Sequence, residues 1–371
     1  SNGTNATIDN VSVKEVLGQE VVPNSGCGSW LLEGQSTNLV NYSEDFSNGG
    51  WGKINCSISS NQIISPDGTL NADKLVQTIG NSQHQIMKPL SANSNCSYSL
   101  YVKKGEIGYI QIASAVNALD YCNFDLINGS IGNYGTSAIN PTIEEVGNGW
   151  FRCVVTMTSS SNSFRIFLIN SASASWFESY NALNSTDGIY IYGAQLEQKS
   201  YITSYIPTTQ GATSTRLQDI ANNSGNASLI NSEEGVLYAE ISALSDDLTN
   251  RFIALTDTTA NNSVSLFYGG GSSNFIRCEI KSNNITQAEL TTTSYQITNY
   301  NKIAISYAEN NFALWVNGVE VATDTSGSTP IGLSNLSFNR ANILNFYGKT
   351  KALAVYKTAL TDEQLTLLTT I

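Results

Sequence analysis

Short stretches in which apolar and polar residues alternate recur along the whole chain. Clear examples are "FRCVVTMT" (151–158), "SFRIFLIN" (163–170) and "NKIAISYA" (301–308). Gly, Asn, Asp and Ser recur between such stretches, and these residues favour turns. Apolar residues spaced three and four apart, as in a helix, are rare. The pattern predicts an all-β protein built from antiparallel β-sandwiches.

Two local patterns near the C-terminus predict individual elements. Asn317–Gly318 lies between the apolar arms Leu314–Val316 and Val319–Val321, and Asn-Gly readily adopts the two positive φ angles of a type I′ hairpin turn. Further on, Thr361 and Gln364 have the spacing of a capping box. We therefore expect a β-hairpin followed, at the end of the chain, by a short helix packed on its sandwich.

One long segment interrupts the alternation and suggests a domain boundary. Residues 208–232 are rich in small polar residues and lose the strand pattern, as is typical of a linker. A chain of 371 residues is also longer than one domain normally requires. We expect two jelly-roll sandwiches in tandem, at 29–207 and 233–371.

The start of the chain resembles the end of a sandwich module. In residues 6–16 the apolar positions follow the same spacing as in residues 189–197, which the pattern predicts to be a closing strand. A closing strand at the beginning of a chain would belong to an earlier module. The hypothesis is that residues 1–28 are the remnant of a preceding module and a connector.

The composition narrows the range of partners. Only 13% of the residues are charged, the formal net charge is −12, and the sequence pI is about 4.5. Such a charge opposes contact with phosphate backbones and anionic lipid, so nucleic acid is not an expected partner. No apolar run of about 20 residues is present, and no membrane insertion is expected.

The cysteines and the single histidine argue against metal-based or triad chemistry. The cysteines lie far apart and mostly within predicted strands, which favours buried, reduced thiols. They are Cys27, Cys56, Cys96, Cys122, Cys153 and Cys278. Their spacing does not fit a zinc site. With His84 as the only histidine, a histidine-dependent nucleophilic mechanism is difficult to assemble.

Several motifs carry a resemblance to known families. Residues 29–209 contain, in order, "LLEGQSTNLVNYSEDFSNGGW" (31–51), "SPDGTLNADKL" (65–75), "YSLYVKKG" (98–105), "GNGWFRCVVT" (147–156) and "GIYIYGAQLEQ" (188–198). This region resembles the carbohydrate-binding-module-like jelly-roll domains of bacteriophage tail, fibre and other virion proteins. "LWVNGVEV" (314–321) and "LAVYKTALTDEQL" (353–365) give residues 233–371 a resemblance to the laminin-G and concanavalin A-like lectin/glucanase superfamily.

The resemblance implies a function and a location. It implies a non-catalytic, carbohydrate-binding component of a bacteriophage particle, assembled in the bacterial cytoplasm, that recognises host surface polysaccharide beside other virion proteins. Two alternatives stay open: a structural virion decoration or connector that binds no sugar, and a secreted bacterial protein that binds or degrades glycans. Fibre proteins are commonly trimeric, but no heptad repeat enforces a trimer here, so the oligomeric state stays open.

Catalysis is not expected from the carboxylates. Retaining glucanases of the concanavalin A-like superfamily carry a Glu-x-Asp-x-x-Glu pattern, in which two carboxylates flank the scissile bond. No such pattern occurs, and Glu240 and Glu279 stand without the required partners. A polysaccharide lyase would need a histidine in the same domain. We therefore predict neither a glycoside hydrolase nor a lyase.

A sugar site needs aromatic faces and short polar side chains on a rim. The polar stretch 170–188 and the Gly-rich stretch 266–275 offer such side chains, and two further tyrosines lie elsewhere in the first sandwich. The candidates are Trp176, Tyr180, Tyr134, Tyr109, Tyr268 and Asn274. The alternatives are that Trp176 folds back to cover the core under its own loop and that 266–275 is an ordinary hairpin loop.

Calcium is the one metal that the resemblance allows, as a structural ion. Asp187 and Asp257 are the weak candidate ligands. No EF-hand spacing surrounds them, and exposed turn aspartates are the usual interpretation of such residues. No other cofactor is expected.

Overall fold

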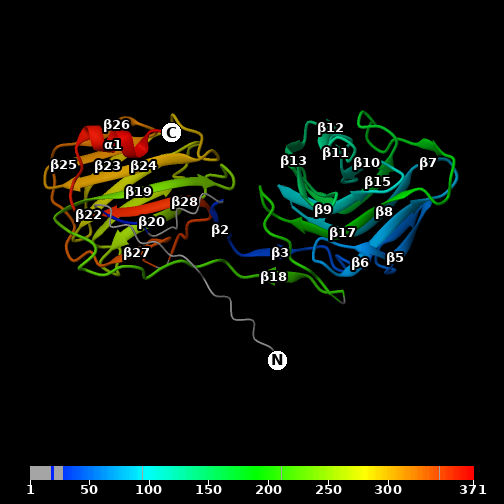
Figure 1. Cartoon of the computed structure of the whole chain (residues 1–371), viewed down its shortest axis with the longest axis horizontal. Helices are drawn as coiled ribbons and strands as arrows, with labels where there is room; N and C mark the ends of the chain where they lie inside the picture. Colours follow the sequence, from blue (N-terminus) through cyan, green and yellow to red (C-terminus); the bar gives the residue numbers. More distant parts are fainter. Residues whose placement is uncertain (1–17, 21–27, 94, 210, 342) are drawn as a thin grey trace, which may run out of the picture. The chain divides into compact units, whose positions relative to one another are not determined.

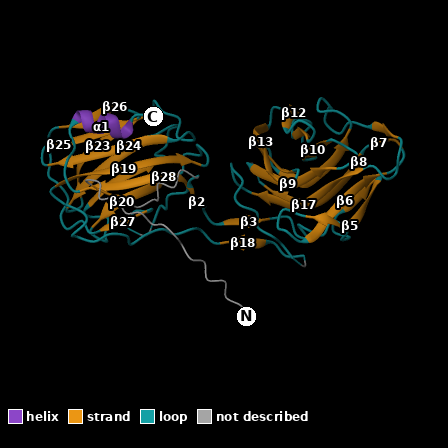
Figure 2. Cartoon of the chain, viewed as in Figure 1, coloured by secondary structure: helices purple, strands orange, loops and turns teal. Residues whose placement is uncertain are grey.

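The chain folds into two β-sandwich domains, each with its own core. The structure, a computed structural model, describes residues 18–20, 28–93, 95–209, 211–341 and 343–371. The first domain spans residues 35–217. The second domain comprises residues 218–371 together with the described residues 18–20 and 28–34. Figure 2 shows strands throughout and a single short helix in the described part of the chain. The predicted all-β class with a short C-terminal helix is confirmed.

The first domain is built from two antiparallel sheets, sheet I and sheet II. Sheet I has the order β12 (Ser130–Tyr134), β11 (Tyr121–Asp125), β10 (Tyr109–Ala113), β15 (Ser161–Ile169), β8 (His84–Ala92) and β4 (Gly52–Ile54). Sheet II has the order β13 (Ala138–Gly147), β14 (Trp150–Met157), β9 (Cys96–Lys104), β17 (Gly188–Glu197), β6 (Leu70–Gln77) and β5 (Cys56–Ile64). Short pairs are formed by β7 (Gly80–Ser82) with β16 (Tyr180–Ala182), and by β3 (Ser36–Asn38) with β18 (Ser214–Arg216).

Alternation along the strands builds the core of the first domain. Ile110 and Ile166 of sheet I and Leu100, Val155 and Ile191 of sheet II belong to one cluster, and each is fully buried. Because successive side chains of a strand point to opposite faces, the residues between them face outward. The indole rings of Trp51 and Trp150 are also buried; Trp51 belongs to this cluster, whereas Trp150 packs with Ala72 and Tyr192 in a separate one.

The second domain also contains two antiparallel sheets, sheet III and sheet IV. Sheet III has the order β1 (Gly18–Glu20), β28 (Gly348–Tyr356), β19 (Glu234–Ala243), β24 (Asn301–Ala308), β25 (Asn311–Val316) and β26 (Val319–Asp324), with β2 (Trp30–Leu32) also on β28. Sheet IV has the order β23 (Ile285–Thr292), β22 (Ile276–Ser282), β21 (Ser263–Tyr268), β20 (Arg251–Thr256) and β27 (Asn335–Ser337).

Both local predictions for the second domain are confirmed. Asn317 and Gly318 have φ of 51° and 84° and connect β25 to β26, as a type I′ turn requires. The helix α1 (Asp362–Thr369) begins with a capping box between Thr361 and Gln364. It lies over β24, β25 and β26 (Figure 1), and Leu365 is buried in the cluster between helix and sheet.

The domain boundaries differ from those suggested by the pattern. Residues 30–32 pair with β28 of the second domain. Residues 208–232 are divided between the domains: Ser214–Arg216 pair with β3 of the first, whereas Ile230 is buried in the core of the second. The strand proposed at 6–16 lies outside the described residues. The assignment of residues 30–32 to the first domain was wrong because edge pairing depends on distant partners.

The cysteines behave as small buried side chains where they are described. Cys96, Cys122, Cys153 and Cys278 are buried, Cys56 is half-buried, and all are free thiols. Burial raises the pKa of Cys96 to about 11, so these thiols are poor nucleophiles at neutral pH. Cys27 lies outside the described residues. No helix within the described ranges is long and apolar enough to cross a membrane.

Candidate functional site

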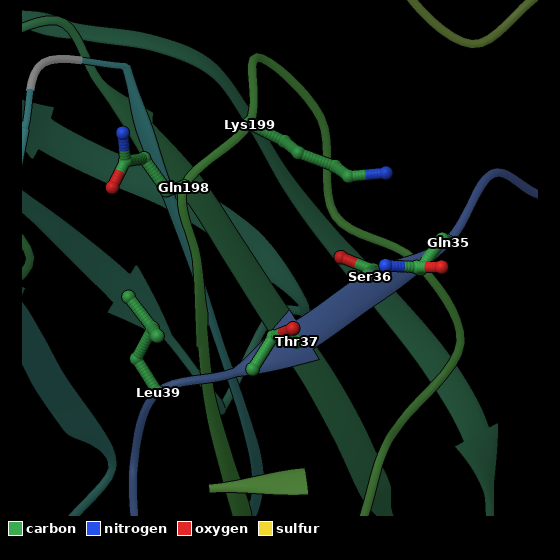
Figure 3. Close-up of a pocket in the computed structure, with 6 residues that line it drawn as sticks. All are labelled: Gln35, Ser36, Thr37, Leu39, Gln198 and Lys199. Atoms are coloured by element: carbon green, nitrogen blue, oxygen red, sulfur yellow. The ribbon is translucent and has the colours of Figure 1, made fainter. Parts of the chain in front are cut away.

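An open recess of about 310 Å³ lies in the first domain beside β3. Its lining comes from β3 and the residues around it and from the two residues that follow β17 (Figure 3). The lining residues are Gln35, Ser36, Thr37, Leu39, Gln198 and Lys199. In the view of Figure 3, Lys199 extends toward the side occupied by Gln35 and Ser36. The recess therefore joins amides, hydroxyls, one ammonium and one apolar side chain.

Buried polar side chains hold both walls of this recess in place. Asn38, fully buried, donates from Nδ2 to the carbonyl oxygens of Ala194 (3.0 Å) and Ile206 (2.9 Å). Its Oδ1 accepts the backbone N–H of Leu196 at 3.1 Å. Because this one amide bonds to β17 and to the segment after it, the position of β3 against both is fixed.

The segment after β17 is held by two further buried side chains. Glu197 accepts the N–H (2.6 Å) and the hydroxyl (2.6 Å) of Thr203. Gln195 accepts the N–H of Ile206 at 2.6 Å. These bonds fold residues 198–206 back against β17. Gln198 and Lys199 consequently stay at the recess.

One hydroxyl group in the recess has unused hydrogen-bonding capacity. Ser36 is only 4% exposed, and its Oγ has no hydrogen-bond partner among the described residues. By contrast, Thr37 Oγ1 lies 2.8 Å from Thr215 Oγ1. The ammonium of Lys199 lies 5.3 Å from the centre of the Tyr201 ring. A buried polar atom without a partner is costly, and a ligand hydroxyl in the recess would remove that cost.

The loop that carries the candidate Trp176 is fastened to the outer face of sheet I. Gln111 donates to the carbonyl of Ser175 (3.0 Å) and accepts the N–H of Phe177 (3.1 Å). Asn123 donates to the carbonyls of Ala172 (3.1 Å) and Ala174 (2.6 Å). Both amides are fully buried, so residues 172–177 are a fixed cover of the sheet.

Trp176 packs within that cover. Its ring stacks on Phe177 with a 4.0 Å centroid separation, Phe177 packs on Phe167 at 4.5 Å, and the indole N–H donates to the carbonyl of Ser114 at 3.3 Å. Trp176 remains half-buried. Most of the surface of Trp176 is therefore covered, as in the alternative in which this residue folds back over the core. Only part of the ring is available to a ligand.

The other first-domain candidates are dispersed. Tyr109 is half-buried in the same small cluster as Trp176. Tyr180 packs toward the core, and its hydroxyl donates to Gln77 at 2.5 Å; burial raises its pKa. Tyr134, at the end of the edge strand β12, is 52% exposed. The structure brings Tyr109 and Trp176 together in one cluster. Tyr134 and Tyr180 lie outside this cluster, and none of the four residues lines the recess.

The two second-domain candidates make hydrogen bonds within their own domain. Tyr268 is fully buried in the core, where its hydroxyl donates to the carbonyl of Ile241 at 3.2 Å, and burial raises its pKa. Its expected place on the rim of a sugar site was wrong, because Val264, Leu266 and Tyr268 share the inward phase of β21. Asn274 is half-buried and accepts the N–H of Ile297 at 3.3 Å.

The aspartates and the histidine also have structural partners. Asp257 accepts the N–H of Thr259 (2.9 Å) and the amide of Asn262 (2.8 Å). Partial burial raises its pKa, but these bonds outweigh burial and leave the pKa below its ordinary value. Asp187 accepts from Asn184 at 3.1 Å. His84, buried in β8, lies 2.7 Å from the carbonyl of Asn55. Within the described ranges, no three acidic, cysteine or histidine side chains converge on a metal position.

Glu44 and Asp67 share the hydroxyl group of a tyrosine of sheet II. The Tyr192 hydroxyl lies 3.0 Å from Glu44 Oε1 and 2.8 Å from Asp67 Oδ2. Asp67 also accepts from Thr69 and Asn71, and these hydrogen bonds, acting against burial, lower its pKa. The tyrosine hydroxyl occupies the space between the carboxylates, so the pair fixes a turn to the sheet.

Sequence reasoning missed the residues that line the recess. Ser36, Gln198 and Lys199 lie far apart along the chain and belong to no motif of a binding site. The one available signal was the run of polar residues directly before and after predicted strands. Such runs are common in a chain rich in Asn, Ser and Thr, so this signal selects no position.

The second domain can be compared with a known family. Residues 237–366 match the model of the concanavalin A-like lectin/glucanases superfamily. The second domain is laminin G/concanavalin A-like. No curated protein matches the chain.

The solved structures to which this chain is similar share little sequence with it. The CBM40 domain of a Ruminococcus gnavus IT-sialidase, bound to alpha2,3 sialyllactose, is 16% identical with a TM-score of 0.35, covering 41% of this chain and 95% of that chain. A SAP-like pentraxin of Limulus polyphemus is 11% identical with a TM-score of 0.30 (39% and 72%). Domains LG4-5 of the mouse laminin alpha1 chain are 9% identical with a TM-score of 0.27 (76% and 92%). At such values, the ligand must be argued from this chain's own residues.

Proposed function

We propose that this chain is a non-catalytic glycan-binding protein whose first domain holds a hydroxyl-rich sugar in the recess beside β3. The observation that carries the proposal is the buried Ser36 hydroxyl, which has no partner among the described residues. A sugar hydroxyl both donates and accepts, so it can satisfy this group. Water can do the same, and the experiment below distinguishes the two.

The remaining lining suits the same class of ligand. The exposed amides of Gln35 and Gln198 each offer donors and an acceptor, which is the pairing that neighbouring hydroxyls on a pyranose require. Leu39 offers an apolar surface for the C–H face of the ring. A volume of about 310 Å³ lies at the lower end of the range for ligand pockets, roughly 300 to 1,000 Å³. A mono- or disaccharide unit of a longer chain fits this size.

The match of residues 237–366 to a lectin and glucanase superfamily supports a carbohydrate-binding role for the chain as a whole. The proposal includes no catalysis. Its support is that the hydroxyl of Tyr192 lies within hydrogen-bonding distance of both Glu44 and Asp67, in the position that a scissile bond would need between two catalytic carboxylates.

The proposal extends to a bacteriophage particle that uses this chain to recognise host surface polysaccharide. This extension rests on the first-domain motifs, from residues 31–51 to residues 188–198, and their resemblance to virion jelly-roll domains. The same motifs are compatible with a secreted bacterial glycan-binding protein. Detection of the chain in purified virions of its source would separate the two locations.

A structural role without sugar binding is the second candidate function. One observation favours it: residues 172–177, which carry Trp176, are fastened to sheet I by the buried amides of Gln111 and Asn123. In that case the loop is a cover for the sheet, and the domain would join or decorate other virion proteins.

A glycan array on the intact chain, followed by calorimetry on any hit, tests the proposal. Replacing Ser36 by Ala should weaken binding about fivefold, the equivalent of about 1 kcal/mol for one hydrogen bond, and Gln198→Ala should weaken it similarly. Gln62→Ala, an exposed glutamine of β5 outside the recess, serves as the matched control. If Trp176→Ala abolishes binding and Ser36→Ala does not, the aromatic loop is the site. Absence of any hit supports the structural role.

A further inference from the structure

The outer face of sheet IV, in the second domain, carries a cluster of charged side chains. Along β22, Ile276, Cys278 and Ile280 point into the core. Arg277, Glu279 and Lys281 therefore share the outer face. Glu279 is 5% exposed and stands at the centre of the cluster.

Three cations surround this one buried carboxylate. Arg340 reaches Glu279 at 2.5 Å, Arg277 at 3.3 Å and Lys281 at 3.7 Å. Glu289 also pairs with Arg277 at 2.7 Å, but its side chain is 47% exposed, so water screens most of its charge. The cluster keeps a local excess of positive charge in a chain whose formal net charge is −12.

The two guanidinium groups lie over a pair of stacked aromatic rings. Phe252 and Phe267 stack with a centroid separation of 4.3 Å and an interplanar angle of 21°. Arg340 lies 5.5 Å from the centre of the Phe252 ring and Arg277 lies 4.9 Å from that of Phe267. A guanidinium group over a ring is attracted by the ring's face and carries its N–H donors in a planar fork, which suits a carboxylate.

Unpartnered hydroxyls lie on the same face. Ser265 is directly opposite Glu279 in the β21–β22 ladder, and Ser263 is opposite Lys281. Both serines are fully buried, and neither Oγ has a hydrogen-bond partner among the described residues. At 3.7 Å from Glu279, Lys281 is too far for a hydrogen bond to it.

From this geometry we propose that the outer face of sheet IV binds a carboxylate-bearing sugar, such as a uronic acid unit of an acidic polysaccharide. The sugar carboxylate pairs with Lys281 and competes with Glu279 for Arg340 and Arg277. Once Arg340 turns toward the ligand, the hydroxyls of Ser263 and Ser265 become available to the hydroxyls of the sugar. The site is separate from the recess of the first domain and does not depend on that recess being functional.

Titration of the intact chain with oligogalacturonate, measured by calorimetry at low and high NaCl, tests this proposal. Binding should weaken as salt increases, since the contact is ionic. Lys281→Gln should bind about tenfold more weakly, the value of one charge-assisted hydrogen bond. Glu279→Gln should bind several-fold more tightly, because it removes the competing carboxylate. Lys349→Gln, an exposed lysine on sheet III, should bind like the parent.

Controls separate binding on sheet IV from misfolding, from binding in the recess and from simple anion binding. Thermal unfolding must show that each variant is folded, and Ser36→Ala should leave oligogalacturonate binding unchanged even if it abolishes binding in the recess. The proposal is overturned if Lys281→Gln binds like the parent, if folded Glu279→Gln binds more weakly, or if neutral dextran displaces the ligand. Equal affinity for acetate would show a site for simple anions and would also overturn it.

Discussion

The loop at residues 170–182 of the first domain and the segment at residues 338–346 of the second domain are both held by groups on the outer face of a sheet, but by groups of different kinds. In the first domain the anchors are the neutral amides of Gln111 and Asn123. In the second domain the anchor is the ion pair between Arg340 and Glu279. Each anchor is buried or nearly so.

The difference determines what each surface can still bind. An amide that donates and accepts within the loop is saturated and leaves no net charge behind. Three cations around one buried carboxylate leave charge that a second anion can use. The amide-anchored loop is thus a poor site for a charged ligand, whereas sheet IV is the site that we propose for an acidic sugar; the recess beside β3 is a separate surface of the first domain. Amide anchors should also be insensitive to salt, whereas ionic anchors should not.

The largest expected effect concerns the amide anchor. Asn123→Ala removes the hydrogen bonds to the carbonyls of Ala172 and Ala174 and the bond from Gln111. These groups are buried, so some of them lose their partner without gaining water. We expect the free energy of unfolding to fall by about 3 kcal/mol. Chemical denaturation at two salt concentrations measures the loss, which should be the same at both.

The matched control for this variant is Asn133→Ala. Asn133 is exposed and donates to Ser173 of the same loop at 3.2 Å. Its removal should cost less than about 0.5 kcal/mol, because water replaces an exposed partner. Equal losses in the two variants would show that burial of the amide is unimportant, and the comparison would fail.

A smaller effect is expected from the ionic anchor. Glu279→Gln keeps the shape of the side chain but leaves Arg340, Arg277 and Lys281 without their central negative charge. Breaking a buried pair often costs 3–5 kcal/mol, but these cations are partly exposed and the amide oxygen still accepts, so we expect about 2 kcal/mol. The loss should shrink in high salt. Glu289→Gln, whose side chain is 47% exposed, should cost less than about 0.5 kcal/mol.

Local signals in the sequence predicted much of this fold. Three predicted features depend on residues close together in the chain: the Asn317–Gly318 turn, the capping box at Thr361 and the alternation that places Val155 and Ile191 inside. These features arise from positive φ angles, from the N–H groups at a helix N-terminus and from side-chain periodicity. Each of these causes depends only on residues that are near one another in the chain. Such features were therefore correct without knowledge of the tertiary structure.

The domain boundaries and the sites depend on distant partners. Nothing in the sequence of Trp30–Leu32 shows that its partner is β28, because any edge strand offers the same backbone groups. The recess likewise forms only because Asn38 binds to β17 and so brings β3, with Ser36, beside Gln198. For Tyr268, the local pattern was sufficient, since Val264 and Leu266 set its phase, but the neighbouring glycines suggested a loop.

The smallest expected effect comes from a variant of the second domain that removes a charge but keeps a hydrogen-bond acceptor. Asp247 pairs with Arg251 at 2.5 Å, and Arg251 is 1% exposed. Burial raises the pKa of Asp247, but the charge of Arg251 and hydrogen bonds from Thr249 and Arg251 outweigh it, so the folded pKa lies below 3.8. Asp247→Asn retains an acceptor oxygen for Arg251 and loses only the charge. We expect the free energy of unfolding to fall by about 1 kcal/mol at pH 7.

The direction of the pKa shift of Asp247 determines how this loss of stability changes with pH. Because the folded protein binds the proton of Asp247 less tightly than the unfolded chain, the contribution is complete above the ordinary pKa and disappears as the pH falls through the lower folded value. The difference between the parent and Asp247→Asn, measured by denaturation from pH 7 to pH 2, should therefore close below pH 3.8. Glu320→Gln, an exposed carboxylate of β26, should show no such closure. A loss for Asp247→Asn that persists unchanged at low pH would mean that side-chain shape, and not charge, anchors this part of the second domain.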